Sequence, residues 1–329
     1  MRRLSLRSGA DFTKATLIRL GQALNASYVC YGSYDLTLTQ GESDLKNASL
    51  QVTAHIIDLT KMHNGPDASE AGKLTELSKL SEHLAWQSLK YLDPTSNQTV
   101  DQFLAPQKLI RLDALESYSR GLLSTSPDQQ QRWFSQAVAL DPHFSNPAFE
   151  LGNLFYERKD YRQALVWLQR INSNDPRYAE ARFKMGLAAY AAGDYTTSAG
   201  YFRDVAKNYP LGEVYNNLGA AENRLNLPVA LDDFRKALDG DQNDTVYLFN
   251  MGAALLKSGN YVDATKKLEA VIDKNPADTE ARSLLEHARR HENFAPVGNS
   301  PGQDRLKKNF DPSAFRQLKA MVQSKGGSE

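Results

Sequence analysis

Hydrophobic and polar positions in the first hundred residues follow two periods. Residues 14–24 and 70–92 have the three-to-four-residue spacing of amphipathic helices. Between them, residues 26–34 form a short apolar run, and residues 50–56 alternate apolar and polar side chains as a half-buried strand does. The polar stretch 41–47 suits the loop of a hairpin between these two strands. The leucines that define the helical stripes are Leu17, Leu20 and Leu24 in the first helix, and Leu74, Leu77, Leu80, Leu84 and Leu89 in the second.

This helix–strand–strand–helix order over residues 1–100 has too few strands to bury a full sheet alone. An unpaired strand edge invites aggregation, so the pattern indicates an incomplete domain with a further strand upstream of Met1. Residues 1–7 carry early positive charge, as a signal peptide does, but no apolar run of ~7–15 residues follows. As written, the chain lacks an export signal. We therefore expect either a cytoplasmic protein or, if the natural start lies upstream, a periplasmic or envelope protein.

A period of 33 or 34 residues dominates the rest of the chain. A glycine that follows Leu or Met recurs at Gly152, Gly186, Gly219 and Gly252. The second helical segment of each unit then carries a small residue. A large residue follows the small one by four positions, and an apolar residue follows it by seven. These sets are Ala164/Leu168/Ile171, Ser198/Phe202/Val205, Ala230/Phe234/Ala237 and Ala264/Leu268/Val271. Each unit predicts a helical hairpin whose apolar stripe is buried only by stacking on its neighbours.

We expect the glycine and the small residue to lie where the two helices of a hairpin cross, because larger side chains would hold the backbones apart. A degenerate copy precedes the four, with Ala114 to Gly121 as its opening helix and Gln130, Phe134 and Ala137 in its second. Residues 278–291 predict a final capping helix. The predicted fold is thus mainly α: a solenoid of about four clear helical hairpins, a degenerate first one and a cap, preceded by a small, incomplete α/β domain.

The repeat pattern resembles the tetratricopeptide repeat. That resemblance implies a right-handed array of helical hairpins with a concave groove that binds a protein or peptide. The run from Leu20 to Ser33, followed by a strand that ends at Asp58, resembles the second half of the small α/β domain of bacterial TolB-N-like envelope proteins. This second resemblance implies a role in assembly and interaction rather than catalysis. The expected domains are residues 1–100 (partial α/β), 108–291 (solenoid) and 292–329 (linker and amphipathic tail).

The tail combines a linker with an apolar pattern. Residues 293–303 contain two prolines and two glycines, a linker composition. Further apolar residues then fall near helical spacing, with Asp311 and Pro312 as a helix start. We expect this segment to pack back on the solenoid; a docking peptide and plain disorder are the alternatives. The apolar residues are Leu306, Phe310, Phe315, Leu318 and Val322.

Composition excludes several classes of protein. The chain has 39 basic and 39 acidic residues and a net charge of zero, which argues against non-specific binding of nucleic acid or membrane surfaces. No stretch approaches ~18 apolar residues, so we expect no membrane span. The single cysteine, Cys30, forbids an internal disulfide and a multi-cysteine metal site. Because Cys30 lies in an apolar strand without a histidine or lysine partner, we expect a buried, unreactive thiol.

The search for catalytic motifs is negative. The chain contains no glycine-rich dinucleotide or phosphate loop, no zinc-protease helix and no nucleophile elbow. His287 and His291 have a spacing that could hold a metal, but a solvated capping face explains the pair better. We therefore expect a non-enzymatic protein without a cofactor or metal.

The concave groove is the one functional surface that the repeats create. Residues two before, one after and four after each glycine should face it. These are Glu150, Asn153, Tyr156, Lys184, Leu187, Tyr190, Asn217, Ala220, Asn223, Asn250, Ala253 and Leu256. Asparagine amides there can hold an extended peptide through main-chain hydrogen bonds, and tyrosines add flat contact area. The candidate binding residues are Asn153, Tyr156, Tyr190, Asn217, Asn223 and Asn250; the alternative is a merely solubilising polar face.

Two functions fit these patterns. The first is a non-enzymatic scaffold for protein–protein interaction that binds a polypeptide in the groove. The second is a sensory or regulatory fragment of a larger signalling or envelope protein whose effector domain lies upstream. Lys184 is the sole lysine at the groove positions, which disfavours a basic clamp for a partner's terminal carboxylate. The partner and the oligomeric state are left open by the sequence.

Overall fold

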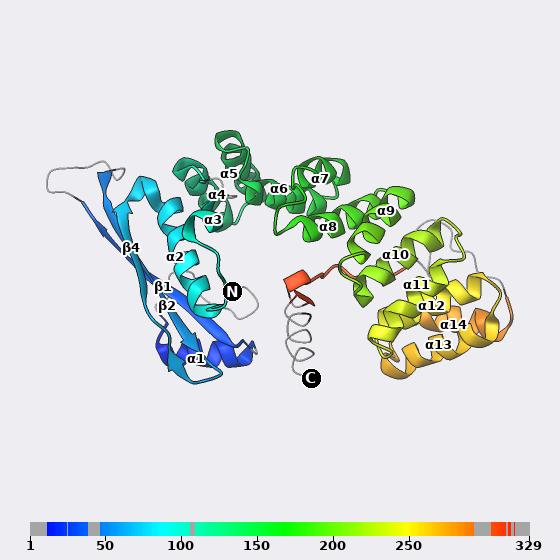
Figure 1. The fold of residues 1–329 in the computed structure, drawn as a ribbon. Coiled ribbons are helices and arrows are strands. Elements are labelled where there is room, and N and C mark those ends of the chain that lie inside the picture. Colours follow the sequence, from blue (N-terminus) through cyan, green and yellow to red (C-terminus); the bar gives the residue numbers. More distant parts are fainter. Residues whose placement is uncertain are drawn as a thin grey trace. The chain divides into compact units, whose positions relative to one another are not determined.

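The chain folds as two compact units in the computed structural model (Figure 1). The first comprises residues 1–119 with 139–143, and the second residues 120–138 with 144–329. The division cuts through the first helical hairpin, and the domain limits given above stay predictions. The residues that the structure describes are 12–24, 26–38, 47–105, 109–292, 304–313, 315–316 and 319.

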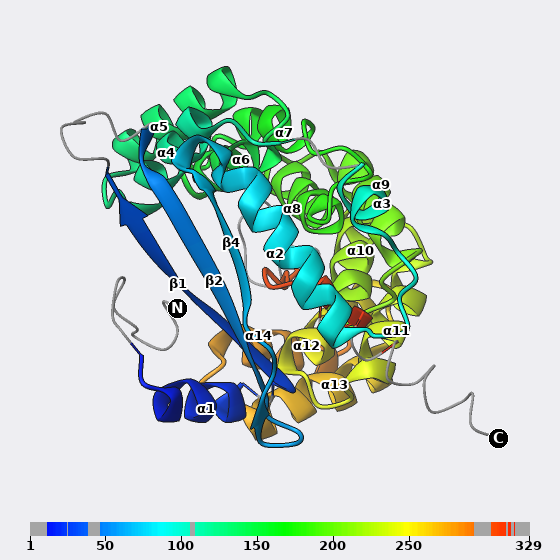
Figure 2. The same ribbon diagram turned by 60° about the vertical axis from the view of Figure 1, so that its left-hand side comes forward.

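The first unit is built on an antiparallel sheet. Its strands are β1 (Tyr28–Thr37), β2 (Ser49–Asp58), β3 (His63–Asn64) and β4 (Ala68–Lys73). Strand β2 is central: β1 pairs along one side of it, while β3 and β4 pair along the other. The helices of this unit are α1 (Lys14–Ala23), the 3-10 turn η3 (Leu74–Glu76), α2 (Leu77–Leu92) and α3 (Val100–Leu104). Figure 2 shows α2 lying along β4.

Helix α2 covers the apolar face of β2 and β4. Leu50 and Ile56 on β2 are 3% exposed, and Leu80 and Leu84 of α2 are buried with them. A side chain at Gly72 of β4 would lie 3.2 Å from Leu80, so glycine allows α2 to approach the sheet closely. The expected helices near both ends, the strand over residues 50–56 and the hairpin pairing of the two long strands are confirmed. The expected alternation of burial holds only at the start of β2, since residues 52–55 are all half-buried.

The helix expected over residues 70–92 is wrong in its first part. Residues 68–73 form β4, and the regular helix begins at Leu77. The sequence of β4 is Ala-Ser-Glu-Ala-Gly-Lys, which has no β-branched or aromatic side chain to predict a strand. It is a strand because β2 offers it hydrogen bonds and α2 covers it. Strand β3 was also not expected, and most of the expected loop 41–47 lies outside the described residues.

The expectation of a buried Cys30 is wrong, because this thiol is exposed. Cys30 lies opposite Ile56 in the register of β1 and β2. Ile56 is covered by α2, but α2 packs on β2 and β4 and does not extend over β1. Among the described residues β1 pairs only with β2, so its apolar side chains are largely open to solvent; Tyr34 is 74% exposed. At the N-terminal end, Leu17 and Gly21 of α1 are buried, whereas Leu24 of the expected stripe is 61% exposed.

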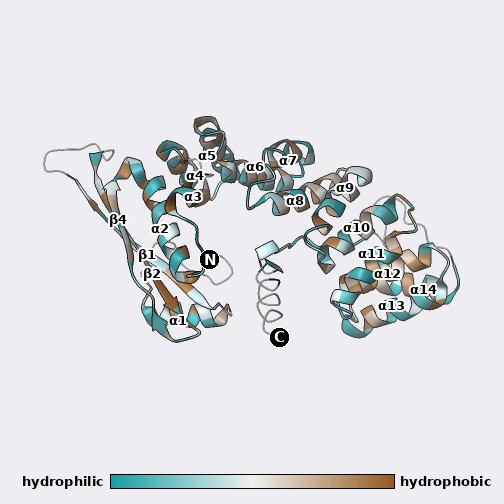
Figure 3. Cartoon of the chain, viewed as in Figure 1, coloured by the Kyte–Doolittle hydropathy of each residue, from teal (hydrophilic) through white to brown (hydrophobic). Residues whose placement is uncertain are grey.

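The second unit is the predicted array of helical hairpins. The helices, in pairs from the first hairpin onward, are α4 (Leu112–Leu123) and α5 (Pro127–Leu140), α6 (Ser145–Glu157) and α7 (Tyr161–Leu168), α8 (Tyr178–Ala191) and α9 (Tyr195–Ala206), α10 (Gly212–Arg224) and α11 (Ala230–Gly240), and α12 (Thr245–Lys257) and α13 (Tyr261–Lys274). A last helix, α14 (Thr279–Arg289), packs on α13 as the cap. Figure 3 shows that these helices carry both hydrophobic and hydrophilic residues, as amphipathic helices that stack on one another must.

The repeated glycines lie at the helix crossings. A Cβ atom on Gly152 would lie 2.5 Å from Leu168, one on Gly186 2.7 Å from Phe202, and one on Gly252 2.8 Å from Leu268. Gly219 faces Phe234 and Gly121 of the degenerate copy faces Phe134 in the same way. The expectation for the glycines is therefore confirmed in every repeat, and the small residue also lies at the crossing in two of them, Ser198 beside Gly186 and Ala230 beside Gly219. The helices approach closely because glycine leaves room for a large side chain of the second helix.

Each hairpin turn has the same backbone. The residue seven positions after the glycine has a positive φ of 57 to 82° in all four clear repeats; these residues are Lys159, Gly193, Asn226 and Gly259. In three of the turns an acidic or amide side chain then caps the second helix: Asp160, Asp194 and Asn260. At the cap of the array, His291 stacks on Tyr261 with ring centroids 5.0 Å apart, and His287 lies 3.1 Å from Glu292.

A buried acidic pair connects α10 and α11, the helices of the fourth hairpin. The carboxylate of Glu222 accepts a 2.6 Å hydrogen bond from Arg203, and Lys236 donates to Asp233 at 2.7 Å. Glu222 and Asp233 are 2% and 3% exposed. The second oxygen of Glu222 has no hydrogen-bond donor among the described residues. Burial and the neighbouring Asp233 raise the pKa of Glu222 to about 7, so a proton held between the two carboxyls would satisfy that oxygen.

Replacing Gly186 should destabilise the second unit. In Gly186→Ala the new methyl group would collide with Phe202, which is fully buried against Phe183, so we expect a loss of about 1–3 kcal/mol in the free energy of unfolding despite the better helix propensity of alanine. The matched control is Gly200→Ala in α9, where nothing lies within 4 Å of the new methyl group. This control should gain up to about 1 kcal/mol. Urea unfolding followed by circular dichroism measures both, and equal effects of the two substitutions would contradict the crossing model.

Glu222→Gln should flatten the pH dependence of stability. Because the pKa of Glu222 in the folded chain lies above its ordinary value of 4.5, the folded state holds a proton that the unfolded state releases between these two values. Stability contributed by this group therefore falls as pH rises from about 5 to 8, and the glutamine variant should gain about 1–2 kcal/mol relative to the wild type over that range. Chemical unfolding at both pH values measures the difference. Asp232→Asn, at an exposed position of the neighbouring helix α11, is the control and should show no such change.

Candidate functional site

Residues 304–310, which we call the tail segment, lie on the first helices of the later repeats. In Figure 1 the segment passes beside α10. It contains no helix, so the helical spacing expected between Leu306 and Phe310 is wrong; helical residues begin at Pro312, as expected. Leu306 packs instead against the cores of both the third and fourth hairpins. The described part of the tail therefore packs on the solenoid, as expected. Leu318 and Val322 lie outside the described residues.

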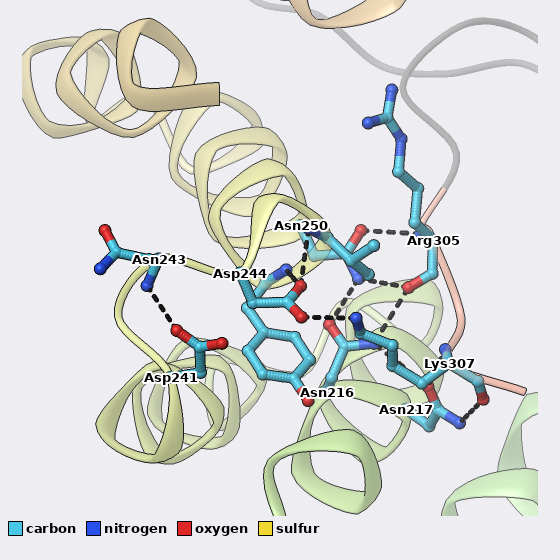
Figure 4. Close-up of polar contacts among 10 residues, drawn as sticks. Asn216, Asn217, Asp241, Asn243, Asp244, Asn250, Arg305 and Lys307 are labelled. Carbon is cyan, nitrogen blue, oxygen red and sulfur yellow. Dashed lines mark hydrogen bonds and ion pairs between the residues drawn. The ribbon is translucent and has the colours of Figure 1, made fainter. Parts of the chain in front are cut away.

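Two asparagines, one on each of two neighbouring repeats, hold the main chain of the tail segment (Figure 4). The side chain of Asn250 donates to the carbonyl of Arg305 and accepts from its N–H, both at 2.7 Å. The side chain of Asn217 makes the same two bonds to Lys307, both at 2.8 Å. Asn217 and Asn250 are 33 residues apart, which is one repeat. The two residues that they hold are two positions apart, as on one face of an extended strand.

We call each pair of hydrogen bonds between an asparagine side chain and the main chain of the tail segment an asparagine clamp. A third asparagine connects the two clamps. Asn216 donates to the carbonyl of Arg305 at 2.9 Å and to the side chain of Asn217 at 3.1 Å, and it accepts from Asn250 at 2.8 Å. All three asparagines are fully buried beneath the tail segment. Each amide orientation is fixed by its neighbours, so the three side chains form one connected network with the bound main chain.

The carboxylate of Asp304 is enclosed by three side chains. Asn223 donates to one oxygen at 2.6 Å, while Tyr190 and Arg224 both approach the other at 3.1 Å. The Asp304 side chain is 2% exposed. Burial raises the pKa of Asp304, although these three donors oppose the change, and burial together with the nearby Asp304 raises the pKa of Tyr190.

Two of the three basic side chains of the tail segment, Arg305 and Lys307, bind acidic residues at helix N-termini. The guanidinium of Arg305 lies 3.4 Å above the ring of Phe249 and bonds to both oxygens of Asp278 at 2.7 and 2.8 Å, with Glu280 at 2.9 Å. The ammonium of Lys307 pairs with Asp244. Asp244 and Asp278 are also the N-caps of α12 and α14. Each carboxylate therefore serves the fold and the tail segment at once.

Phe310 inserts between aromatic rings. Its ring stacks on Phe183 with centroids 4.8 Å apart, and the edge of Tyr209 faces it at 5.6 Å. Phe183 is 1% exposed in this arrangement. The intervening Lys308 and Asn309 are exposed, so the repeats contact the segment at selected positions rather than along its whole length.

Four of the six candidate residues meet at this surface: Tyr190, Asn217, Asn223 and Asn250. The other two, Asn153 and Tyr156 on α6, have no hydrogen bond with the described part of the tail. Asn153 donates to Glu150 at 3.3 Å, and its own oxygen is buried without a partner among the described residues. Tyr156 packs on the ring of Tyr161. That any of the six binds a partner stays a prediction.

The sequence analysis missed several residues that contact the tail segment, among them Arg224, Asp278 and Tyr209. One of the missed positions recurs with the repeat. The residue three before the repeat glycine also faces the tail segment, as Phe183, Asn216 and Phe249 show. The corresponding residue of α6 is Phe149. The guanidinium of Arg177 lies over its ring instead, 3.6 Å from the ring centroid. The recurrence of Phe or Asn at this position of four repeats was a signal that the sequence contained. It is concealed because a large apolar residue at helical spacing also fits an ordinary core position.

Within the described residues, no group of three or more His, Cys, Asp or Glu side chains is arranged to hold a metal ion. In that same part of the chain, no helix has both the length and the apolar character to cross a membrane.

Removing either asparagine clamp should expose the amides of the tail segment. We expect Asn250→Ala to speed hydrogen–deuterium exchange of the Arg305 amide, and Asn217→Ala that of the Lys307 amide, by about tenfold or more, since each loses two hydrogen bonds worth ~1 kcal/mol apiece. Asn153→Ala removes the same side chain from α6, where it has no hydrogen bond to the tail, and should leave both rates unchanged. Exchange of both amides at the rate of a free peptide in the wild type would contradict the described arrangement.

Comparisons with known proteins match the helical part of the chain. Residues 149–213 and 183–245 match the family model for the tetratricopeptide repeat. No curated protein matches the chain. None of the first 148 residues is covered by the matched family model, and the TolB-N-like resemblance stays a prediction.

The similar solved structures are distant in sequence. YrrB, described as a TPR protein with an unusual peptide-binding site, is 17% identical, with 54% of this chain and 92% of that one covered and a TM-score of 0.46. MamA from Desulfovibrio magneticus is 17% identical over 52% of this chain and 99% of its own, with a TM-score of 0.48. A thermophilic TPR protein from Thermus thermophilus is 15% identical, with coverage of 54% and 95% and a TM-score of 0.40. This chain thus contains tetratricopeptide repeats, a fold that is generally a scaffold for protein–protein interaction.

Proposed function

We propose that the chain is a non-enzymatic scaffold that binds an extended segment of a partner polypeptide on the surface where its own tail segment lies. The observation that carries the proposal is the pair of clamps that Asn217 and Asn250 make with a peptide backbone. Both amide groups of each side chain are used, and both partners are main-chain atoms. Such contacts are independent of the side chains of the bound segment and are available to any polypeptide of suitable shape.

The clamps need an occupant. With the tail segment in place, Asn216, Asn217 and Asn250 are fully buried and their amides are satisfied. Withdrawal of the segment would leave three adjacent amides without main-chain partners on the face of α10 and α12. Water can replace these bonds only in part, because the surface also contains the buried apolar ring of Phe249, which lies against Arg305. A surface of this kind favours one bound polypeptide over none.

Phe183 and Tyr190 extend the surface beyond the clamps. Both are aromatic and both contact the bound segment, Phe183 through Phe310 and Tyr190 through Asp304. Rigid aromatic side chains lose little conformational entropy on binding, which makes them good anchors for a partner. Asn153, Tyr156 and Lys184 on α6 and α8 make no hydrogen bond with the described tail, and we propose that a longer partner segment reaches them. Burial lowers the pKa of Lys184, although nearby glutamates oppose this change.

The function is tested by peptide binding to a full-length chain whose own tail is weakened. In the receptor, Arg305→Pro and Lys307→Pro together remove the two N–H donors that the clamps accept and leave every residue of the surface intact. We expect this receptor to bind a fluorescent peptide of residues 303–313. Asn217→Ala with Asn250→Ala should weaken that binding by at least about tenfold, because four hydrogen bonds are lost. Fluorescence anisotropy measures the dissociation constants.

Asn153→Ala in the same receptor is the matched control and should leave the affinity within about twofold, as it has no hydrogen bond to the tail segment. Circular dichroism of each variant shows that the helices are retained. Equal affinity with and without the two clamp asparagines, or no binding at all, would overturn the proposed function.

A further inference from the structure

The surface distinguishes side chains as well as holding a backbone, and this selectivity identifies the chemistry of the partner. We propose that the partner's segment carries an acidic residue followed at once by arginine, then lysine three positions after the acid and an aromatic residue six positions after it, and that it binds by displacing residues 304–310. This inference rests on the proposed function and adds the kind of sequence that is bound. In the tail segment these four positions are occupied by Asp304, Arg305, Lys307 and Phe310.

The first position requires a carboxylate. Asn223, Tyr190 and Arg224 converge on Asp304, and Arg224 is itself only 16% exposed. A neutral apolar residue there would leave a largely buried guanidinium and an amide without their acceptor. The cost falls on the groove rather than on the ligand, so the requirement holds for any segment that binds.

The second position requires a planar cation. The guanidinium of Arg305 has Phe249 beneath its face and two carboxylates, Asp278 and Glu280, at its edge. Its bonds to Asp278 use both oxygens, which is the forked geometry that arginine offers and lysine lacks. Lysine would keep the charge but lose the second bond and the stacking. Discrimination between these two residues is therefore expected.

The fourth and seventh positions complete the pattern. Lys307 pairs with Asp244 and lies 5.0 Å from the ring centroid of Tyr247, so an extended cation is matched by charge and by an aromatic face. Phe310 fills the space between Phe183 and Tyr209. By contrast, Lys308 is exposed and forms no ion pair with the described residues, so the surface does not select at this position.

Charge favours the same partner. The acidic residues Asp244, Asp278 and Glu280 lie on the side of the surface that receives Arg305 and Lys307, and Arg224 lies where Asp304 binds. The order of charges along the tail segment is thus complementary to their order on the repeats. A segment with the reverse order would place like charges together in a partly buried setting, which is unfavourable.

The tail segment is then a built-in competitor. Because it is tethered to the same chain, it acts at a high effective concentration, and a partner with the same pattern binds only when it displaces the segment. A free peptide of residues 303–313 should therefore bind the wild-type chain at least about tenfold more weakly than the Arg305→Pro/Lys307→Pro receptor.

The test places every substitution in the peptide, so that none of them can unfold the chain. The receptor is the Arg305→Pro/Lys307→Pro chain, which we call the proline-tail receptor, and fluorescence anisotropy measures its affinity for the peptide. We expect each of four peptide substitutions to weaken binding by about fivefold or more: Asp304→Asn, Arg305→Lys, Lys307→Ala and Phe310→Ala. The matched control is Lys308→Ala, which makes the same change of charge at the neighbouring exposed position and should alter the affinity by less than about twofold. A peptide of the same composition in scrambled order should bind at least about tenfold more weakly.

The outcomes separate this inference from the proposed function. If scrambled and ordered peptides bind equally well, and both lose affinity with Asn217→Ala and Asn250→Ala, the surface binds polypeptides but the pattern is overturned. If Lys307→Ala and Lys308→Ala have equal effects, the pattern is likewise overturned. Equal affinity of the wild type and the proline-tail receptor overturns the competition by the tail segment. Loss of all dependence on the two asparagines overturns the proposed function itself.

Discussion

The close approach of two helices at a glycine is the constraint on which the second unit depends. At Gly152, Gly186 and Gly252 a large side chain of the second helix occupies the place where a Cβ atom would be. This contact fixes how far apart the helices lie and how one is rotated relative to the other. Since it recurs every 33 or 34 residues, equivalent positions of successive first helices are brought to the same face.

The asparagine clamps are a direct consequence of that regularity. Asn217 and Asn250 occupy the same position of consecutive repeats, and the array places them where they hold residues 305 and 307 of one extended segment. Neither asparagine would be a binding residue by itself, because a single exposed amide bonds equally well to water. Together with Asn216 they form a buried network that the backbone of a polypeptide completes. A spacing of helices fixed by packing thus becomes a spacing of hydrogen bonds.

The same residues serve stability and binding at the edge of this surface. Asp244 and Asp278 cap α12 and α14 through backbone N–H groups and also hold Lys307 and Arg305. A carboxylate at a helix N-terminus is held in place by the cap and is favoured by the helix dipole. It is therefore already oriented when a cation arrives. The selectivity that we propose for arginine and lysine needs no structure beyond what the repeats require for folding.

Much of this protein was determined by its sequence alone. The period of the glycines, with the small, large and apolar residues after them, predicted the hairpins, their crossings and the capping helix, because these are local patterns with one physical solution. The same period placed Asn217, Asn223, Asn250 and Tyr190 on one face. The candidates Asn153 and Tyr156 followed from identical reasoning, but in this structure the tail segment does not bond to them.

Only the tertiary structure decided the rest. Strand β4 has no strand-forming residues and exists because β2 and α2 provide its partners, and Cys30 is exposed because α2 does not cover β1. The spacing of Leu306 and Phe310 suits a helix, yet the segment is non-helical because Asn217 and Asn250 supply the hydrogen bonds that a helix would have supplied. The periodicity of the sequence predicts which contacts a residue makes within its own helix or strand and on which face it lies. It cannot record partners some 55 or 90 residues away, such as those of Arg305 and Lys307, and these decide where the tail lies.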